Sequence, residues 1–269
     1  MRIAQIEIGQ RAPLALIAGL NVLESERAAA ECARTLKTLG KRHDVPVVFK
    51  ASFDKANRTR RDAYRGPGLE AGLAMLTAVK TETGLPLLTD VHEPAQAARA
   101  AEVVDCLQVP AFLCRQTDLL AACGATGLPV NLKKGQFVAP PDLRHAVDKL
   151  RGFGCEDVLV TERGTSFGYN DLVVDMRALL EIRAYAPVCF DATHAVQYPG
   201  RQGGASGGDR RFVAPLARAA VAVGIDALFV ETHPDPDNAP VDGPSQIVPE
   251  ALDALLGEVC AISRALGRG

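Results

Sequence analysis

The stretch KASFDKANR, residues 50–58, places several potential anion-binding side chains directly after the apolar run PVVF. It holds three basic and two hydrogen-bonding side chains: Lys50, Lys55, Arg58, Ser52 and Asn57. Basic groups this close repel one another unless an anion lies between them, which favours one or two bound phosphate groups. Taken alone, the stretch fits an exposed loop better, with Asp54 as a local ion-pair partner. The choice depends on the elements around it.

Eight short apolar runs recur along the chain, and each is too short to be a helix. They cover residues 14–18, 46–49, 85–88, 106–109, 128–132, 158–160, 187–190 and 227–230. Continuous apolar runs of this length are typical of parallel strands that are covered on both faces.

Segments of helical composition separate these runs. They cover residues 24–39, 69–81, 94–101, 117–123, 143–151, 172–183, 211–223 and 249–266. Thr117 and Asp171 are candidate N-caps, and Pro94 suits a first helical turn.

This alternation predicts a single α/β domain, a (β/α)8 TIM barrel, over residues 1–269. Ile3, Gln5, Ile6 and Ile8 alternate in polarity, so we expect residues 1–12 to form a short N-terminal β-hairpin appended to the barrel. An open doubly wound sheet is the alternative, but no G-x-G-x-x-G sequence follows the first strand.

Polar side chains stand at the carboxyl end of each predicted strand. In chain order they are Asn21 and Glu24, Lys50, Asp90 and His92, Gln108, Lys133 and Lys134, Glu162 and Arg163, Asp191 and His194, and Glu231 and His233. In a barrel these ends converge on one mouth, where the active sites of barrel enzymes lie.

The converging cations predict a multiply charged ligand. Lys50, Lys55, Lys133 and Arg163 would come together from three strands, which fits a phosphate plus a carboxylate. A second phosphate would be held further along the second loop, by Asn57, Arg58 and Thr59. We therefore expect two anionic substrates.

His194, Glu231 and Asp242 could bind a divalent metal if a thiolate completed the set. The residue at the end of the first strand is Asn21 rather than Cys, and an amide is a poor ligand for a soft metal. We therefore expect no metal or other cofactor, and a metal site built on these three residues is the lesser alternative.

The stretch 197–209 is rich in glycine and has the composition either of a lid over the mouth or of an ordinary surface loop.

Composition limits the partners. Thirty basic and thirty-two acidic residues give a net charge of -2, which argues against nucleic acid or an anionic membrane surface as the main partner. No apolar segment approaches the roughly 20 residues of a membrane helix, and no signal-peptide pattern opens the chain. Seven scattered cysteines without a C-x-x-C pair are typical of reduced core thiols, so we expect a cytoplasmic protein.

The chain resembles the 3-deoxy-D-manno-octulosonate 8-phosphate synthase family between Leu16 and Gln246. Six segments carry the resemblance in order: KASFDKANR, TDVHEP, LQVPAFLCRQTDLL, NLKKGQF, CFDATHAVQYPG and ETHPDPDNAPVDGPSQ. It implies a transferase that condenses phosphoenolpyruvate with D-arabinose 5-phosphate and water, for lipopolysaccharide biosynthesis.

The resemblance also implies roles for individual residues. Those implied for phosphoenolpyruvate are Lys50, Ser52, Lys55, Gln108, Ala111, Lys133, Arg163 and His194. Those implied for arabinose 5-phosphate are Asn57, Arg58, Thr59, Asp90, His92 and Arg115, the last supplied by a neighbouring subunit of a homotetramer. The expected catalytic residues are Lys133, a proton donor, with His194, Asn21, Asp242 and Glu231.

Some positions depart from the family pattern. Thr59 and Arg60 stand where two serines are usual, so one hydroxyl is kept and the other is exchanged for a cation. Asn21 and Pro244 are similar to the metal-independent members, whereas Gln246 is similar to the metal-dependent ones.

Two rival functions remain. The related synthase that uses erythrose 4-phosphate carries K-P-R-T where this chain has residues 55–58, KANR. A barrel without activity that binds sugar phosphates as a sensor would share the anion-binding residues, so only turnover separates it from an enzyme.

Overall fold

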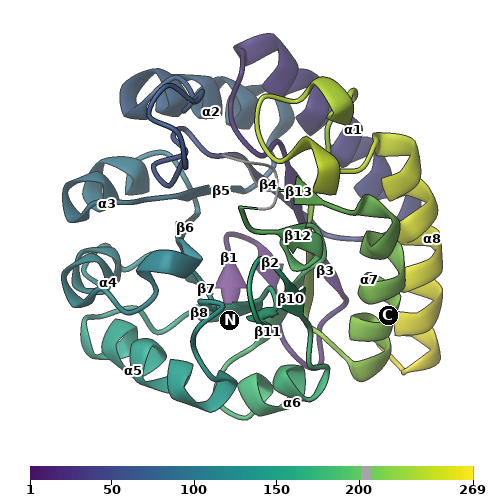
Figure 1. Ribbon diagram of the computed structural model, residues 1–269. Helices are drawn as coiled ribbons and strands as arrows, with labels where there is room; N and C mark the ends of the chain where they lie inside the picture. The colour runs from purple at the N-terminus through teal and green to yellow at the C-terminus, as the bar shows by residue number, and fades with distance from the viewer. Residues whose placement is uncertain (201–206, 269) are drawn as a thin grey trace.

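The structure, a computed structural model, describes residues 1–200 and 207–268 and has a closed parallel barrel at its centre (Figure 1). Its strands follow the order β11-β14-β3-β4-β5-β6-β7-β8. Their bounds are β3 (Ala15–Gly19), β4 (Val47–Lys50), β5 (Leu87–Asp90), β6 (Cys106–Val109), β7 (Val130–Lys133), β8 (Val158–Glu162), β11 (Val188–Asp191) and β14 (Ala227–Glu231). The predicted (β/α)8 barrel is confirmed.

Helices surround the barrel on all sides (Figure 1). The α-helices are α1 (Glu26–His43), α2 (Leu69–Thr83), α3 (Pro94–Ala101), α4 (Thr117–Gly124), α5 (Arg144–Gly152), α6 (Arg177–Arg183), α7 (Val213–Val223) and α8 (Pro249–Ala265). Short 3-10 helices are η1 (Ala111–Leu113), η2 (Pro140–Leu143), η3 (His194–Val196), η4 (Arg210–Phe212), η5 (Pro236–Asn238) and η6 (Gly243–Ser245). No helix in the described ranges is long and apolar enough to cross a membrane.

The predicted helix over residues 172–183 is wrong in its first half. Leu172–Val173 forms β10, which pairs antiparallel with β9 (Thr165–Ser166), and α6 begins only at Arg177. Asp171 is therefore not an N-cap, and Thr117 is the first residue of α4 rather than its cap. A two-residue strand is stabilised by its partner, so its own sequence does not distinguish it from a helical turn.

Barrel residues alternate between two layers. Outward-facing Leu16, Val47 and Phe49 belong to the large cluster shared with the helices, whereas inward-facing Ile17 and Val48 belong to a small cluster inside the barrel. Both faces of each strand are thus buried, which explains the continuous apolar runs in the sequence.

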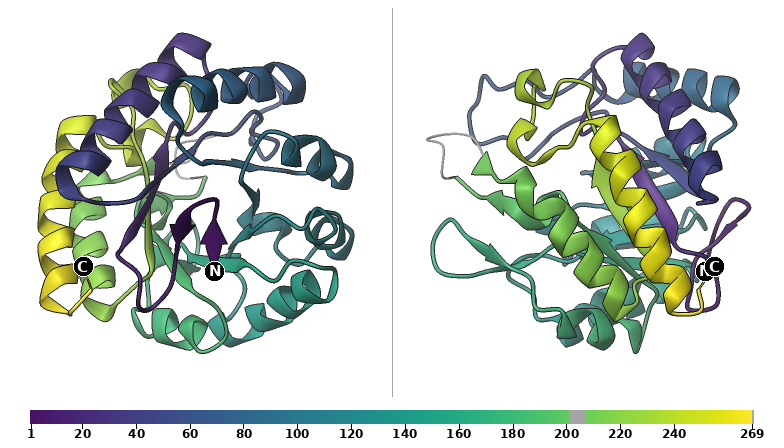
Figure 2. Two further views of the ribbon diagram at one scale, coloured as in Figure 1. Left: turned by 180° about the vertical axis from the view of Figure 1, so that it is seen from behind. Right: turned by 90° about the vertical axis from the view of Figure 1, so that its right-hand side faces the viewer.

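The N-terminal hairpin closes one end of the barrel (Figure 2). It consists of β1 (Arg2–Ile3) and β2 (Ile6–Glu7), paired antiparallel. Ile3, Ile6 and Ile8 are buried in the inner cluster, against the inward-facing strand residues. The expected hairpin is confirmed, but it is part of the barrel core rather than an appendage.

A second small sheet lies over the opposite end. In it β12 (Gln197–Tyr198) pairs antiparallel with β13 (Gly207–Gly208). The glycine-rich stretch predicted as a lid or surface loop, 197–209, lies in part outside the described residues, at 201–206.

Candidate active site

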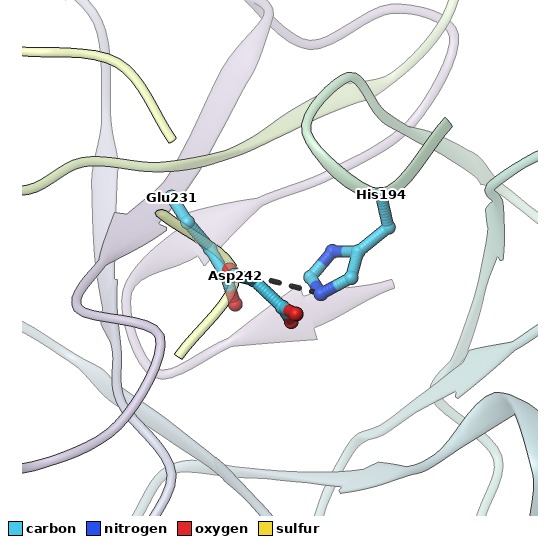
Figure 3. Close-up of side chains that lie close together, drawn as sticks. All are labelled: His194, Glu231 and Asp242. Atoms are coloured by element: carbon cyan, nitrogen blue, oxygen red, sulfur yellow. Dashed lines mark ion pairs between the residues drawn. The ribbon is translucent and has the colours of Figure 1, made fainter. Parts of the chain in front are cut away.

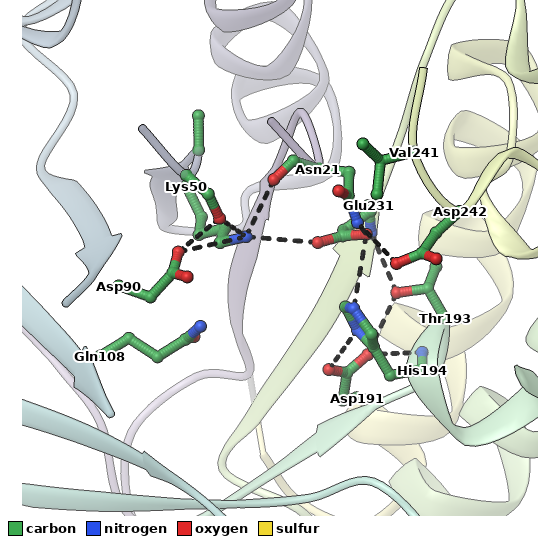
Figure 4. A network of polar contacts seen from close by, with 12 residues as sticks. Asn21, Lys50, Asp90, Gln108, Asp191, Thr193, His194, Glu231, Val241 and Asp242 are labelled. Atoms are coloured by element: carbon green, nitrogen blue, oxygen red, sulfur yellow. Dashed lines mark hydrogen bonds and ion pairs between the residues drawn. The ribbon is translucent and has the colours of Figure 1, made fainter. Parts of the chain in front are cut away.

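Polar side chains end most of the barrel strands and meet at one end of the barrel (Figure 4). This end, here called the mouth, lies opposite the N-terminal hairpin (Figure 2). Those that point inward are Lys50, Asp90, Lys133, Asp191 and Glu231, each the last residue of its strand. The predicted strands ended one residue before most of them, because a polar residue after an apolar run does not indicate that the hydrogen bonds of the sheet extend to it. Their predicted convergence is confirmed.

Lys50 lies among carboxylates of the protein itself. Its Nζ donates to Ser52 Oγ at 2.9 Å and to Glu231 Oε1 at 3.3 Å, and it lies 3.8 Å from Asp90 Oδ1. Burial disfavours the charge on Lys50, but Glu231 and Asp90 outweigh it and raise the pKa. The argument from cation repulsion is therefore wrong for this lysine, which already has counter-ions.

Asp90 connects Lys50 to the next strand. Its Oδ1 accepts a short hydrogen bond from Ser52 Oγ, and its Oδ2 lies 3.0 Å from His92 Nε2. Burial opposes the charge, but Lys50 and His92 hold the pKa of Asp90 well below its usual range. Asp90 and His92 are thus fixed at the mouth as predicted.

Lys133 and His194 share one carboxylate, that of Asp191. Lys133 Nζ donates to Asp191 Oδ2 in a short contact, and His194 Nδ1 lies 2.7 Å from the same oxygen. Asp191 Oδ1 accepts from Thr193 Oγ1 at 3.1 Å and from the His194 backbone N–H at 2.9 Å. Burial opposes the Asp191 charge, but His194 and Lys133 hold its pKa well below the usual range.

Lys133 responds differently from Lys50. Burial lowers its pKa, and the attraction of Asp191 only partly offsets this. Its Nζ also lies 3.3 Å from the centre of the Phe229 ring, a cation–π contact. A lysine with a lowered pKa can give up a proton more readily, which suits the predicted proton donor.

Asn21, the residue expected in place of a cysteine ligand, joins two carboxylates. Its Nδ2 donates to Glu231 Oε2 at 2.5 Å and to Asp242 Oδ2 at 3.2 Å. Its Oδ1 is buried without a hydrogen-bond partner among the described residues, so it can accept a bond from a bound molecule.

His194, Glu231 and Asp242 face one another (Figure 3), and the Asn21 amide bonds to both carboxylates. One possible ligand atom from each lies within 4.8 Å of the others, and His194 Nε2 is 3.7 Å from Glu231 Oε2. Burial favours neutral Glu231, but His194 and Lys50 outweigh it and hold its pKa at about 2. The three residues fit a divalent cation by ligand type, although the Asn21 N–H groups already bind both carboxylates.

Arg163 and Lys55 are cations that form no ion pair within the described ranges. Arg163 is buried, its Nη2 donates to Gln197 Oε1 at 2.8 Å, and its Nη1 has no partner within the described part of the chain. Burial lowers the pKa of Arg163, while Asp191 and Asp242 oppose this. Lys55 is half-buried, and burial together with Lys50 lowers its pKa. Two cationic groups are thus available to an anion.

The remaining predicted residues lie at the edge of this network. Asn57 and Thr59 are exposed, and Arg58 is half-buried with Nε unpartnered among the described residues. Gln108 Oε1 accepts from Asn131 Nδ2 at 3.1 Å. Ala111 begins η1, and Arg115 is exposed beyond that turn.

Two features of the site were not predicted. No role was predicted for Asp191 or Thr193, although the position of Asp191 at a strand end was the available signal. Lys134 and Glu162 were also predicted at the mouth, whereas strand alternation turns both outward, where they pair with each other beside the segments that follow β7 and β8.

Comparison with known proteins agrees with this geometry. The family model described as DAHP synthetase I family matches residues 1–264. A 2-dehydro-3-deoxyphosphooctonate aldolase of Syntrophotalea carbinolica is 55% identical over 97% of this chain and 95% of its own. Proteins of the same name from Desulfatibacillum aliphaticivorans and Rhodopseudomonas palustris are 54% and 56% identical, over 97% and 93% of this chain and 96% and 88% of theirs. The chain therefore belongs to the DAHP synthetase I family.

Proposed function

We propose that this protein condenses phosphoenolpyruvate with D-arabinose 5-phosphate and water, giving 3-deoxy-D-manno-octulosonate 8-phosphate and inorganic phosphate. The observation that carries the proposal is the buried guanidinium of Arg163, whose Nη1 has no partner among the described residues. A buried cation with free donors favours a bound phosphate or carboxylate. Relatives that are more than half identical are named for the eight-carbon product.

The phosphate and carboxylate of phosphoenolpyruvate bind to the cationic side of the mouth. Arg163 and Lys55 supply most of the charge there, and Lys133, whose charge is offset by Asp191, adds a hydrogen-bond donor. Lys50 contributes less net charge, because Glu231 and Asp90 already neutralise it. The other residues assigned to this substrate are Ser52, Gln108, Ala111 and His194.

The sugar phosphate binds along the segment after β4 and at the end of β5. Asn57, Arg58 and Thr59 hold its phosphate, together with an Arg115 supplied by a neighbouring copy of the chain in a homotetramer. Asp90 and His92 hold its hydroxyl groups. Their side chains are already fixed to each other, with 3.0 Å between Asp90 Oδ2 and His92 Nε2. The partners of this cytoplasmic enzyme are thus two small anions and its own copies.

The reaction needs one carbon–carbon bond and one proton transfer to the sugar. C3 of the enol attacks the aldehyde carbon of arabinose 5-phosphate, and Lys133 gives a proton to the alkoxide that forms. Water adds at C2 and one of its protons restores Lys133. The carbon–oxygen bond to the phosphate then breaks, and inorganic phosphate leaves with the proton of the new C2 hydroxyl, which becomes the ketone. Positioning two anions against their mutual repulsion accounts for much of the catalysis.

The water that adds at C2 is oriented by groups around Asn21. The free Oδ1 of Asn21 accepts one of its hydrogens, and His194 Nε2 is directed toward the same region, opposite Glu231. Asp242 belongs to the same group, because its Oδ2 accepts a hydrogen bond from Asn21 Nδ2 at 3.2 Å.

The reaction proceeds without a metal in this proposal. A metal bound by His194, Glu231 and Asp242 would have to displace the two hydrogen bonds from Asn21 Nδ2. The amide nitrogen has no lone pair for a cation, so it would not become a fourth ligand.

Phosphate release from phosphoenolpyruvate tests the proposal, with arabinose 5-phosphate and separately with erythrose 4-phosphate, each with and without a strong chelator. We expect turnover with the five-carbon sugar alone, unchanged by the chelator. Loss of activity in the chelator, restored by a divalent ion, would keep the function and reject the metal-free site. Turnover only with erythrose 4-phosphate would favour the related synthase, and turnover with neither sugar would favour the sensor.

A further inference from the structure

Lys134 and Glu162 form a buried ion pair outside the mouth. Lys134 directly follows Lys133, and Glu162 directly precedes Arg163. Because successive side chains of a strand point to opposite faces, Lys134 and Glu162 point outward from the barrel. Their side chains are 0% and 1% exposed, with 3.5 Å between Lys134 Nζ and Glu162 Oε2. Burying two charges inside a protein is unfavourable, and apolar side chains of similar size often give a more stable protein. The pair therefore needs an explanation other than its own attraction.

The lysine satisfies polar groups of two irregular segments. Its Nζ lies within hydrogen-bonding distance of four acceptors in the segments that follow β7 and β8: Gly135 O at 3.2 Å, Val138 O at 3.4 Å, Gly164 O at 3.3 Å and Thr165 Oγ1 at 3.2 Å. Buried carbonyl groups outside regular structure need a donor, and one ammonium group here serves both segments.

The glutamate holds the same residue from its other side. Glu162 Oε1 accepts the Gly164 N–H at 2.6 Å, so the pair binds both the N–H and the carbonyl of Gly164. Gly164 has φ +91°, a conformation that residues with a side chain rarely adopt. This fixed turn directly follows Arg163, the residue whose guanidinium lies in the mouth.

We propose that Lys134 and Glu162 are positioning residues for the anion site: they clamp Gly164 and thereby hold the Arg163 guanidinium where phosphoenolpyruvate binds. The inference rests on the proposed function for the identity of that anion. Lys134 also bonds the carbonyls of Gly135 and Val138, so the segment after Lys133 is fixed by the same ammonium. Neither positioning residue touches the substrate.

Steady-state kinetics of Lys134→Met test the clamp. We expect the KM for phosphoenolpyruvate to rise by about tenfold or more, the effect of weakening one charge-assisted hydrogen bond, with a much smaller change in kcat. The KM for the sugar should change little. A matched pair, Glu162→Gln and Glu162→Met, separates the loss of the hydrogen-bond acceptor from the loss of the negative charge. Both variants remove the charge, but only glutamine keeps an oxygen for the Gly164 N–H. Glu162→Gln should therefore retain a KM close to that of the wild type.

Arg183→Met is the control for loss of a buried ion pair. Arg183 Nη2 lies 3.0 Å from Asp226 Oδ1, and Asp226 keeps a second ion pair to Arg268 Nη2 at 2.8 Å. Within the described ranges, the side-chain hydrogen bonds of Arg183 and Asp226 involve none of residues 163–166. This variant should lower Tm without changing either KM. If Lys134→Met does not fold, Lys134→Met/Glu162→Met leaves no unpaired charge and should show the same rise in KM.

Hydrogen exchange gives a readout that does not depend on turnover. The amides of residues 163–166 should exchange faster in Lys134→Met than in the wild type or in Arg183→Met. Unchanged exchange, or a fall in Tm without a rise in the KM for phosphoenolpyruvate, would overturn the inference.

Calorimetry separates failure of the clamp from failure of the proposed function. If the wild type turned over neither sugar, the function would fail, and binding of inorganic phosphate to the wild type and Lys134→Met would decide the clamp. Equal phosphate affinities would then overturn it, and a weaker affinity in the variant would support it.

Discussion

Lys133 and Asp191 are paired inside the barrel, the ammonium of β7 donating to the carboxylate of β11, and this pair sets the acidity of the predicted proton donor. Burial lowers the pKa of Lys133, and Asp191 acts in the opposite direction. As pH rises through this pKa, Lys133 loses its proton and kcat should fall. Asp191→Asn removes the opposing charge, so the alkaline limb of the pH–kcat profile should move to lower pH.

Thr193→Val provides the control for this shift. It removes one hydrogen bond to Asp191, 3.1 Å long, without changing a charge. Its alkaline limb should stay close to that of the wild type. An alkaline limb of Asp191→Asn at or above the wild-type pH would contradict the assignment of that limb to Lys133.

Lys133→Met should reduce kcat by about 10²–10⁴-fold, the usual contribution of a positioned general acid. The KM for phosphoenolpyruvate should rise as well, because the same ammonium lies on the cationic side of the mouth. Rapid-quench measurement of phosphate release would separate the two effects. Near-normal turnover in this variant would reject Lys133 as the proton donor.

Asn21→Asp should make the protein respond to divalent cations. The wild-type amide donates to Glu231 and Asp242, whereas a third carboxylate would repel both and could serve as a ligand. Without metal we expect the free energy of unfolding of this variant to fall by about 2 kcal/mol and its Tm by roughly 5 °C, and Mn²⁺ should partly reverse both changes.

Asn21→Ala separates lost hydrogen bonds from added charge. It should be destabilised but should not respond to Mn²⁺, because it supplies no fourth ligand. Thermal unfolding of each variant with chelator and with Mn²⁺ gives the comparison. If Asn21→Asp melted at one temperature in both conditions, this position would not control a metal site.

Much of the fold was predictable because buried parallel strands have an unmistakable composition. The ends of the strands were less predictable. Lys50 and Asp90 are still part of β4 and β5, although polar residues of this kind are more common in loops. The strand Leu172–Val173 was missed because its stability comes from pairing with Thr165–Ser166. Local sequence does not contain that pairing.

The site was predictable as a set of residues but not as a set of pairs. Strand order brings Lys133, Arg163 and Glu231 to one mouth, and this follows from the barrel alone. Which carboxylate neutralises which cation depends on side-chain distances, so the counter-ions of Lys50 and the role of Asp191 became clear only in three dimensions.

Ile3→Ala should show that the N-terminal hairpin stabilises the barrel. Ile3 is 0% exposed and packs with the residues inside the barrel, so truncation should lower the free energy of unfolding by about 3 kcal/mol. Gln5→Ala, on the exposed turn of the same hairpin, should stay within about 0.5 kcal/mol of the wild type. Because the chain has no Trp, urea unfolding is best followed by far-UV circular dichroism. Equal stabilities of the two variants would mean that the hairpin adds little to the core. The expected difference would mean that the hairpin, by closing one end of the barrel, stabilises the fold that carries the mouth at the opposite end.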